Sequence, residues 1–284
     1  MKLPNLGSLW MLVAAFGFAV MGALVKAGAA KFSSVELVFY RSVFGLATIL
    51  GIAMLQGHTL KTPVMAKQMS RAIVGFLSLV CFFVALAHLP LATAITLNYT
   101  SPLFVAILLP FTLNERPAKP LYLVAILLGF IGVVLLLKPS LHSSDALYGI
   151  LGLLSGFGAA WAYIYIKQLA NMGEPDWRTV FYFTLLSTIG AAVWMLPYSF
   201  TPITWDDLPI IIGLGFSATL AQLAMTRAYR TGNTLTVASL AYATVIFASL
   251  FGAWIWQETL TLSEYAAIGI IILGGLISLH SSRI

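Results

Sequence analysis

Charged residues are scarce in this sequence and make up only 8% of its 284 residues, whereas 60% are hydrophobic. Ordinary soluble domains carry about 25% charged residues, so the composition indicates an integral membrane protein. Cysteine is scarce too, because Cys81 is the single one and lies inside an apolar run. One cysteine excludes a disulfide framework and a cysteine-based metal cluster. The sequence therefore predicts no metal site and no cofactor.

Ionisable residues are missing from the middle of the apolar runs. Glu36, Glu115, Glu258 and Glu264 fall at the ends of runs, and the histidines fall at ends or between runs. The sequence contains no HExxH pair, no carboxylate dyad and no serine–histidine arrangement at a plausible depth. It therefore predicts no catalytic residue, which argues against a membrane-embedded enzyme. It also offers no acid in the middle of a span that could relay protons.

Long apolar runs fill most of the chain. Each is continuously apolar, whereas the strands of a membrane barrel would alternate in polarity over about ten residues. We therefore expect an all-α integral membrane protein with ten transmembrane helices. The runs cover residues 6–27, 35–55, 72–88, 91–113, 121–137, 147–166, 179–196, 208–228, 235–256 and 265–279.

An internal duplication connects the two halves of the chain. The stretch 85–116 matches the stretch 228–258 without a gap when it is shifted by 143 positions. The shared residues include a rare glutamate and a tyrosine, which chance similarity between apolar runs rarely produces. The matched pairs are Thr93 with Thr236, Leu97 with Leu240, Tyr99 with Tyr242, Phe104 with Phe247 and Glu115 with Glu258.

Five helices in each half is an odd number, so the second half must enter the membrane from the side opposite to the first. The sequence thus predicts two inverted five-helix repeats, at residues 1–139 and 140–284, with no further domain. In secondary transporters, inverted repeats place the substrate site near the membrane midplane, where the halves meet.

Basic residues predict the orientation. The net charge is +6, and the basic residues lie between the apolar runs. This distribution is typical of residues that set membrane topology and not of a nucleic-acid-binding face, so no nucleic-acid partner is expected. With both termini on one side, eleven Lys and Arg fall on that side and four on the other, which predicts cytoplasmic termini. The eleven are Lys2, Lys61, Lys67, Arg71, Arg116, Lys119, Lys167, Arg178, Arg227, Arg230 and Arg283.

Polar residues within the runs are the candidates for a substrate site. Asn98, Tyr99 and Ser101 precede Pro102, which removes a backbone donor and predicts a kink at Asn98. Tyr242 lies at the corresponding depth in the second half, and Gln222 lies in the run before it. Each of these side chains either lines a cavity or forms a hydrogen bond between helices, and the sequence leaves both roles open.

Arg41, roughly two turns into its run, has three possible roles. It could extend to the membrane surface, pair with Glu36, or hold a carboxylate or phosphate of the substrate. Trp161, with neighbouring tyrosines, could stack on a planar substrate or simply pack. A single arginine without an intramembrane carboxylate favours a neutral or zwitterionic solute over a free cation.

Glycines at positions 149, 152 and 156 form a small-residue stripe. Such stripes allow close helix packing in lipid, and packing is the favoured role. A hinge at Gly156-Phe157-Gly158 is the alternative, because glycine lowers the cost of bending.

Several motifs resemble an EamA-type half of the ten-helix drug/metabolite transporter superfamily. They are the turn at 85–92, Ser101-Pro102, the end at 113–116, Phe39-Tyr40-Arg41, and in the second half Trp256-Gln257-Glu258 with Gly274-Gly275. Two positions depart from the pattern: Phe16-Gly17 stands where many members have Trp-Gly, and Val245 replaces an expected proline.

The resemblance implies a multi-pass protein of the bacterial inner membrane that moves a small organic metabolite by alternating access. Amino acids, vitamins such as riboflavin, and nucleoside-like solutes such as S-adenosylmethionine are all compatible with it. It implies a small-molecule substrate and the lipid bilayer as partners, and it allows a homodimer. A non-transporting assembly factor or a channel is the alternative function.

Overall fold

A computed structural model describes residues 6–89, 91–113, 119–139, 146–257 and 260–281. Within these residues the chain is helical, and ten segments are long and apolar enough to cross a membrane. The predicted fold class is therefore confirmed. Glu115, Arg116, Glu258, Lys2, Arg283 and most of the connection between the halves lie outside the described residues.

The helices form two related sets. The first contains α1 (Leu6–Gly28), α2 (Ser34–Leu55), α3 (Met65–His88), α4 (Leu91–Asn98), α5 (Ser101–Thr112) and α6 (Pro120–Leu137). The second contains α7 (Ala146–Asn171), α8 (Asp176–Met195), the short 3-10 helix η2 (Trp205–Asp207), α9 (Leu208–Thr231), α10 (Thr234–Leu240), α11 (Ala243–Ile255) and α12 (Leu262–Ser281).

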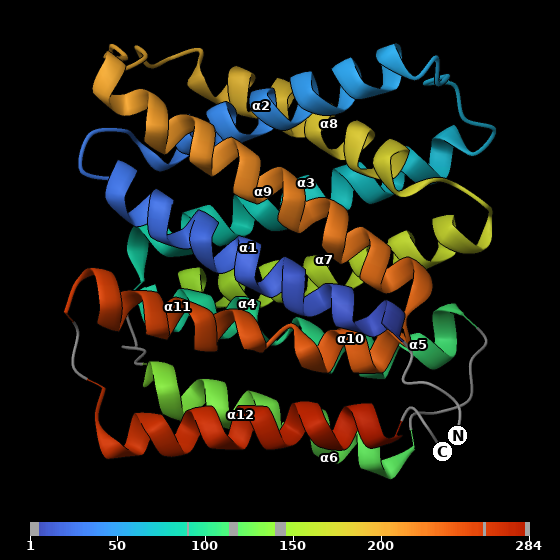
Figure 1. Ribbon diagram of the computed structural model, residues 1–284, viewed down its shortest axis with the longest axis vertical. Coiled ribbons are helices and arrows are strands. Elements are labelled where there is room, and N and C mark those ends of the chain that lie inside the picture. The colour runs from blue at the N-terminus through green and yellow to red at the C-terminus, as the bar shows by residue number, and fades with distance from the viewer. Residues whose placement is uncertain (1–5, 90, 114–118, 140–145, 258–259, 282–284) are drawn as a thin grey trace.

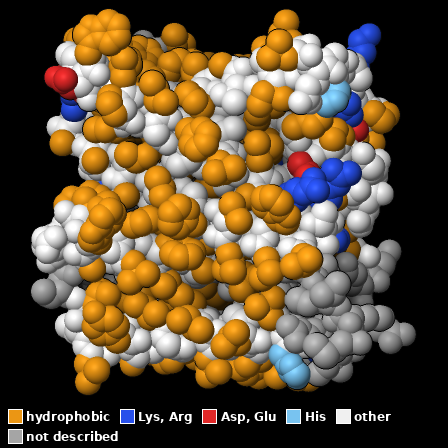
Figure 2. All heavy atoms as spheres, in the orientation of Figure 1, with side chains coloured by type: hydrophobic (Ala, Val, Ile, Leu, Met, Phe, Trp, Pro, Cys, Tyr) orange, Lys and Arg blue, Asp and Glu red, His pale blue; other side chains and the backbone are white. Residues whose placement is uncertain are grey.

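Helices of one half pack against helices of the other half, as expected for inverted repeats (Figure 1). The first helix of each half lies along the third helix of the other, so α1 packs on α9 and α7 packs on α3. The equivalent helices α2 and α8 contact each other, as do α6 and α12. Figure 2 shows hydrophobic side chains across the middle of one face of the bundle, with Lys and Arg near its two edges.

Two spans are broken in the middle, at equivalent positions. The fourth span consists of α4 and α5, which are separated at Tyr99 and Thr100, and the ninth consists of α10 and α11, separated at Ala241 and Tyr242. The predicted kink before Pro102 is thus present. The second break has no proline. Its backbone forms the tighter i to i−3 hydrogen bonds of a 3-10 turn, such as the bond from the Tyr242 N–H to the Ser239 carbonyl.

The third span begins earlier than its apolar run. The sequence places Arg71 outside the run, as a topology signal, but α3 starts at Met65 and Arg71 lies in its second turn. The side chain of Arg71 is only 2% exposed. The run therefore starts too late at residue 72, because the helix begins at Met65 and turns Arg71 toward the protein interior, away from the lipid. The side of the membrane on which Arg71 lies stays a prediction.

One end of the bundle is tied together by Glu174. We name this end the terminal face, because α1 and α3 begin there. The Glu174 carboxylate accepts hydrogen bonds from Thr62 Oγ1 at 2.8 Å, Gln68 Nε2 at 2.9 Å and Arg178 Nη1 at 3.2 Å. Arg178 also donates to the Thr59 carbonyl at 3.0 Å. This Glu174 cluster joins the start of α8 to the connection after α2.

The opposite face has an equivalent arrangement around Glu36. Its carboxylate accepts from the Ser33 N–H at 2.7 Å, within a capping box, and from the Thr201 N–H at 2.6 Å. This Glu36 cluster joins the start of α2 to the connection after α8. Each face is therefore held by a buried carboxylate of one half that binds the connection following the second helix of the other half.

Candidate functional site

A small polar cavity lies between α2, α8 and α9, about halfway through the bundle. It collects donors from both halves of the chain, which meet there. Its lining includes Arg41 and Ser42 from α2, Phe183 and Thr184 from α8, and Ala218, Thr219 and Gln222 from α9. The sequence-predicted candidates Arg41 and Gln222 thus face the same space.

Arg41 is held more loosely than a structural ion pair would require. Its Nη1 donates to the Met21 sulfur at 3.2 Å, and it has no ion pair among the described residues. Glu36, the partner considered from the sequence, is occupied by Ser33 and Thr201. Gln222 Nε2 is buried and has no acceptor. The cavity therefore offers a cation and an amide donor whose hydrogen-bonding capacity is largely unused.

Arg71 extends this set of donors, and sequence reasoning missed it. Its guanidinium stacks over the Phe183 ring at 4.1 Å from the centroid, and it donates no hydrogen bond within the described chain. A signal was present in the sequence: Gln68, Arg71 and Ser78 recur at helical spacing, and all three are buried. A polar stripe on an otherwise apolar span indicates a face turned toward protein.

Four tyrosines gather where the helix breaks meet. Tyr99 and Tyr242, the pair matched by the duplication, have ring centroids 6.2 Å apart, and Tyr163 stacks on Tyr229 at 5.0 Å. Tyr229 and Tyr242 are fully buried with unpaired hydroxyls. We name these four residues the tyrosine cluster. Ser101 is buried at the start of α5, beside the hydroxyl of Tyr163.

Two predicted site residues lie apart from these groups. Asn98 Nδ2 donates to Ser155 Oγ at 3.0 Å and ties α4 to α7, which matches the interhelical role left open by the sequence. Trp161 belongs to a row of aromatic rings along α7, between Phe157 and Tyr165. Tyr163, two residues later, points to the other side of the helix, into the tyrosine cluster.

The two halves differ at one position of the cavity. Helices α2 and α8 match when they are shifted by 142 positions, so Phe39-Tyr40 recurs as Phe181-Tyr182. The next position is Arg41 in the first half and Phe183 in the second, and both line the cavity. The duplicated scaffold therefore carries a cation on one side and an aromatic ring on the other.

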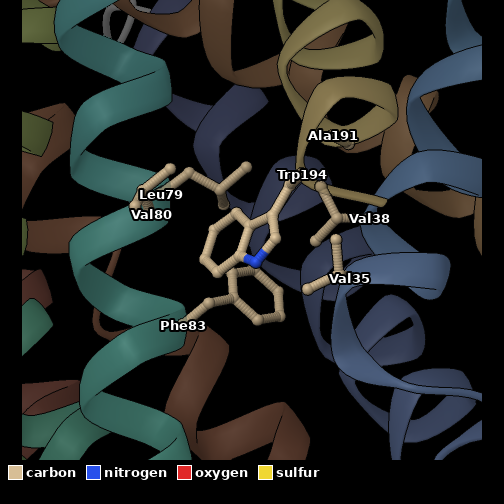
Figure 3. A pocket seen from close by; sticks show the side chains of 7 residues that line it. All are labelled: Val35, Val38, Leu79, Val80, Phe83, Ala191 and Trp194. Atoms are coloured by element: carbon tan, nitrogen blue, oxygen red, sulfur yellow. The ribbon is translucent and has the colours of Figure 1, made fainter. Parts of the chain in front are cut away.

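A second hollow, shown in Figure 3, has a different character. It lies between α2, α3 and α8, and its lining is apolar except for the indole nitrogen of Trp194. A hydrocarbon surface of this kind gives no hydrogen-bonding groups to orient a polar metabolite. The polar cavity, which Arg41 lines, is therefore the better candidate site.

Replacing Tyr242 with phenylalanine separates a binding role from a packing role. The hydroxyl has no hydrogen-bond partner among the described residues, and burying such a group costs about 1–3 kcal/mol, so the variant should melt at an equal or higher temperature. If the hydroxyl binds substrate, KM should rise about two- to tenfold. Thermal unfolding in detergent and transport kinetics measure both effects.

Asn98→Ala is the matched comparison, because it removes the bond to Ser155. We expect it to lower the melting temperature and leave KM unchanged, since interhelical hydrogen bonds in membranes contribute about 0.6 kcal/mol on average. A destabilised Tyr242→Phe variant with unchanged KM would assign Tyr242 to packing alone.

Comparison with known proteins agrees with this architecture. The model of the EamA-like transporter family matches the chain twice, at residues 5–138 and 147–279. A pseudopaline exporter, CntI, from Pseudomonas aeruginosa is 32% identical over 98% of this chain and 96% of its own length. An S-adenosylmethionine uptake transporter from Rickettsia bellii is 25% identical over 100% and 96%. A riboflavin transporter from Brucella anthropi is 29% identical over 69% and 70%.

A solved crystal structure shares the fold, with a TM-score of 0.88, 17% identity and coverage of 99% of this chain and 100% of the other. The two family matches fall on the two sets of helices that the packing relates. The resemblance read from the sequence motifs is thus confirmed. The chain belongs to the EamA-like transporter family and is a membrane transporter of small metabolites.

Proposed function

We propose that this protein is a secondary carrier that works by alternating access and binds its solute between the two halves. The polar cavity and the tyrosine cluster form the site, with Arg41, Gln222, Tyr99, Ser101 and Tyr242 as binding residues. The observation that carries the proposal is the set of buried polar groups at the interface of the inverted halves, where Gln222 Nε2 and the Tyr242 hydroxyl have no partner among the described residues. Intramembrane polar groups without partners mark substrate pathways in transporters.

The arrangement of the two faces supports alternating access. The Glu174 and Glu36 clusters each join one half to the other, at opposite ends of the bundle. Opening either face requires breaking one cluster while the other stays intact, and a carrier needs two such separable closures. In this scheme Asn98 holds α4 to α7, and Trp161 lies in the row of aromatic rings along α7, outside the polar cavity.

The relatives define the range of solutes to test. Their names include an exporter and uptake transporters, for pseudopaline, S-adenosylmethionine and riboflavin. We propose transport of a small organic metabolite without enzymatic conversion, cofactor or nucleic-acid partner.

We also propose that the boundary between the repeats lies at residues 139 and 140. A homodimer is compatible with the exposed apolar surface of α6 and α12.

Reconstituted liposomes test this function. A carrier shows saturable flux, competition and counterflow, with the solute recovered unchanged. A channel shows flux without counterflow, and an enzyme releases an altered product. S-adenosylmethionine, riboflavin, amino acids and organic acids form the first panel, and a protein that moves none of a broad metabolite panel would support the assembly-factor alternative.

Orientation has its own test. We propose that both termini are cytoplasmic, so the terminal face with the Glu174 cluster faces the cytoplasm. Reporter fusions after Gly173, between α7 and α8, should then be active as cytoplasmic fusions, and fusions after Ser199 as external ones. The reverse pattern would contradict the assignment from Lys and Arg.

A further inference from the structure

Two arginines in the interior lack counter-charges. Arg41 and Arg71 both lie within membrane spans, and neither has an ion pair among the described residues. Arginines inside membrane spans almost always pair with other groups or mark the path of a substrate or ion. The two guanidiniums therefore need an explanation that packing alone does not give.

The described carboxylates near the span ends are engaged elsewhere. Glu174 is bound by Arg178, and Glu36 by Ser33 and Thr201. The remaining ion pairs occupy Asp176, Asp207 and Glu264 at the faces of the bundle. Asp206 is exposed at the end of the bundle. No carboxylate of the described chain is thus left to neutralise Arg41 or Arg71 from within.

Phe183 connects the two arginines. It lines the polar cavity together with Arg41, and its ring carries the guanidinium of Arg71. Arg71 also lies within electrostatic reach of Tyr163 in the tyrosine cluster. Arg71 lies early in α3, toward the terminal face, and Arg41 lies early in α2, toward the opposite face. Phe183 contacts Arg71 and shares the cavity with Arg41.

We propose that Arg41 and Arg71 bind two separate anionic groups of one solute, so that this carrier selects metabolites with two carboxylates. Guanidinium groups bind carboxylates with two parallel hydrogen bonds. Arg71 Nε and Nη1 have no partner among the described residues, and the hydrogen bond that Arg41 forms within them runs from Nη1 to the Met21 sulfur. The inference rests on the proposed carrier function and names its substrate class. It revises the expectation of a neutral or zwitterionic solute, which assumed a single arginine.

A matched acid series tests the proposal. Glutarate, glutaramate and glutaramide share a carbon skeleton and carry two, one and no carboxylates; succinate and adipate vary the spacing. Each is measured for thermal stabilisation of the purified protein and for competition with a counterflowing solute. We expect a diacid to bind about tenfold to a hundredfold more tightly than the monoacid of the same length.

Variants assign the effect to the arginines. Arg71→Gln and Arg41→Gln should each reduce diacid binding to the level of the monoacid, and Arg71→Lys should restore part of it, because lysine keeps the charge without the forked geometry. Lys67→Gln, one turn before Arg71 in α3, is the control and should leave the ratio of diacid to monoacid affinity unchanged. A purely structural Arg71 would lower the melting temperature without changing that ratio.

The outcomes separate the two proposals. Counterflow of another solute without preference for any diacid overturns the dicarboxylate inference and leaves the carrier function standing. An unchanged affinity ratio in both arginine variants also overturns it. Absence of saturable counterflow with every solute overturns the carrier function, and the inference with it.

Discussion

Replacing Gly156 with alanine should destabilise the protein strongly and abolish transport. A Cβ atom at this position of α7 would meet Thr100 Oγ1 and would lie 2.7 Å from the Leu97 carbonyl oxygen. Thr100 lies in the break between α4 and α5 and Leu97 in the last turn of α4 before it, so the added methyl group would push this region away from α7. Overpacking of this kind costs about 1–3 kcal/mol, and sometimes more.

Gly22→Ala is the control for this variant. Gly22 lies within α1, and a Cβ atom there would meet nothing within 4 Å. Alanine favours helix by about 1 kcal/mol over glycine, so this variant should melt at an equal or higher temperature. Equal melting temperatures and transport rates for both variants would show that Gly156 does not support the break. That result would also argue against the hinge role at Gly156-Phe157-Gly158, because a hinge that depends on Gly156 would lose transport when the glycine is replaced.

Replacing Glu174 with alanine is the second change with a large expected effect. The carboxylate is buried and accepts from Thr62, Gln68 and Arg178. Without it, the guanidinium of Arg178 stays inside with fewer partners, and removing one member of a buried ion pair costs about 3–5 kcal/mol. The melting temperature should therefore fall sharply.

The same variant should also open the terminal face. A cysteine placed at Thr62 should react faster with a membrane-impermeant maleimide added to that face when Glu174 is alanine. Glu174→Gln keeps one acceptor and should have a smaller effect, and Asp206→Asn, at an exposed position of the opposite face, should have none. Unchanged labelling and melting temperature in Glu174→Ala would contradict a closing role for the cluster.

Much of the fold was predictable because lipid imposes a simple rule on the chain. A span needs about 20 apolar residues, and the runs in the sequence lie near that length. The shortest, residues 265–279, falls within the longer helix α12, Leu262–Ser281. The duplication was visible because Tyr99 and Tyr242 are unusual residues at a fixed separation, and the structure places both at helix breaks. Pro102 predicted the first break through its missing donor.

The composition of the site was harder to predict, because the rotation of each helix depends on its neighbours. A helix that is apolar all around gives no periodic signal of which face is buried. Helix geometry puts Trp161 and Tyr163 on opposite sides of α7, but the sequence did not indicate which of the two faces the tyrosine cluster. Arg71 looked like the edge of a span, and its burial became clear only from its contact with Phe183.

The unneutralised arginines have an electrical consequence. A charge that crosses the whole membrane changes energy by about 2.3 kcal/mol per 100 mV, and charges that cross part of the field change energy in proportion. A bound diacid would cancel the two positive charges of Arg41 and Arg71. Without bound solute, the carrier would keep both positive charges in its interior. Exchange of one solute for another should therefore depend little on membrane potential. Net flux, which needs the unloaded carrier to reorient, should change steeply with it.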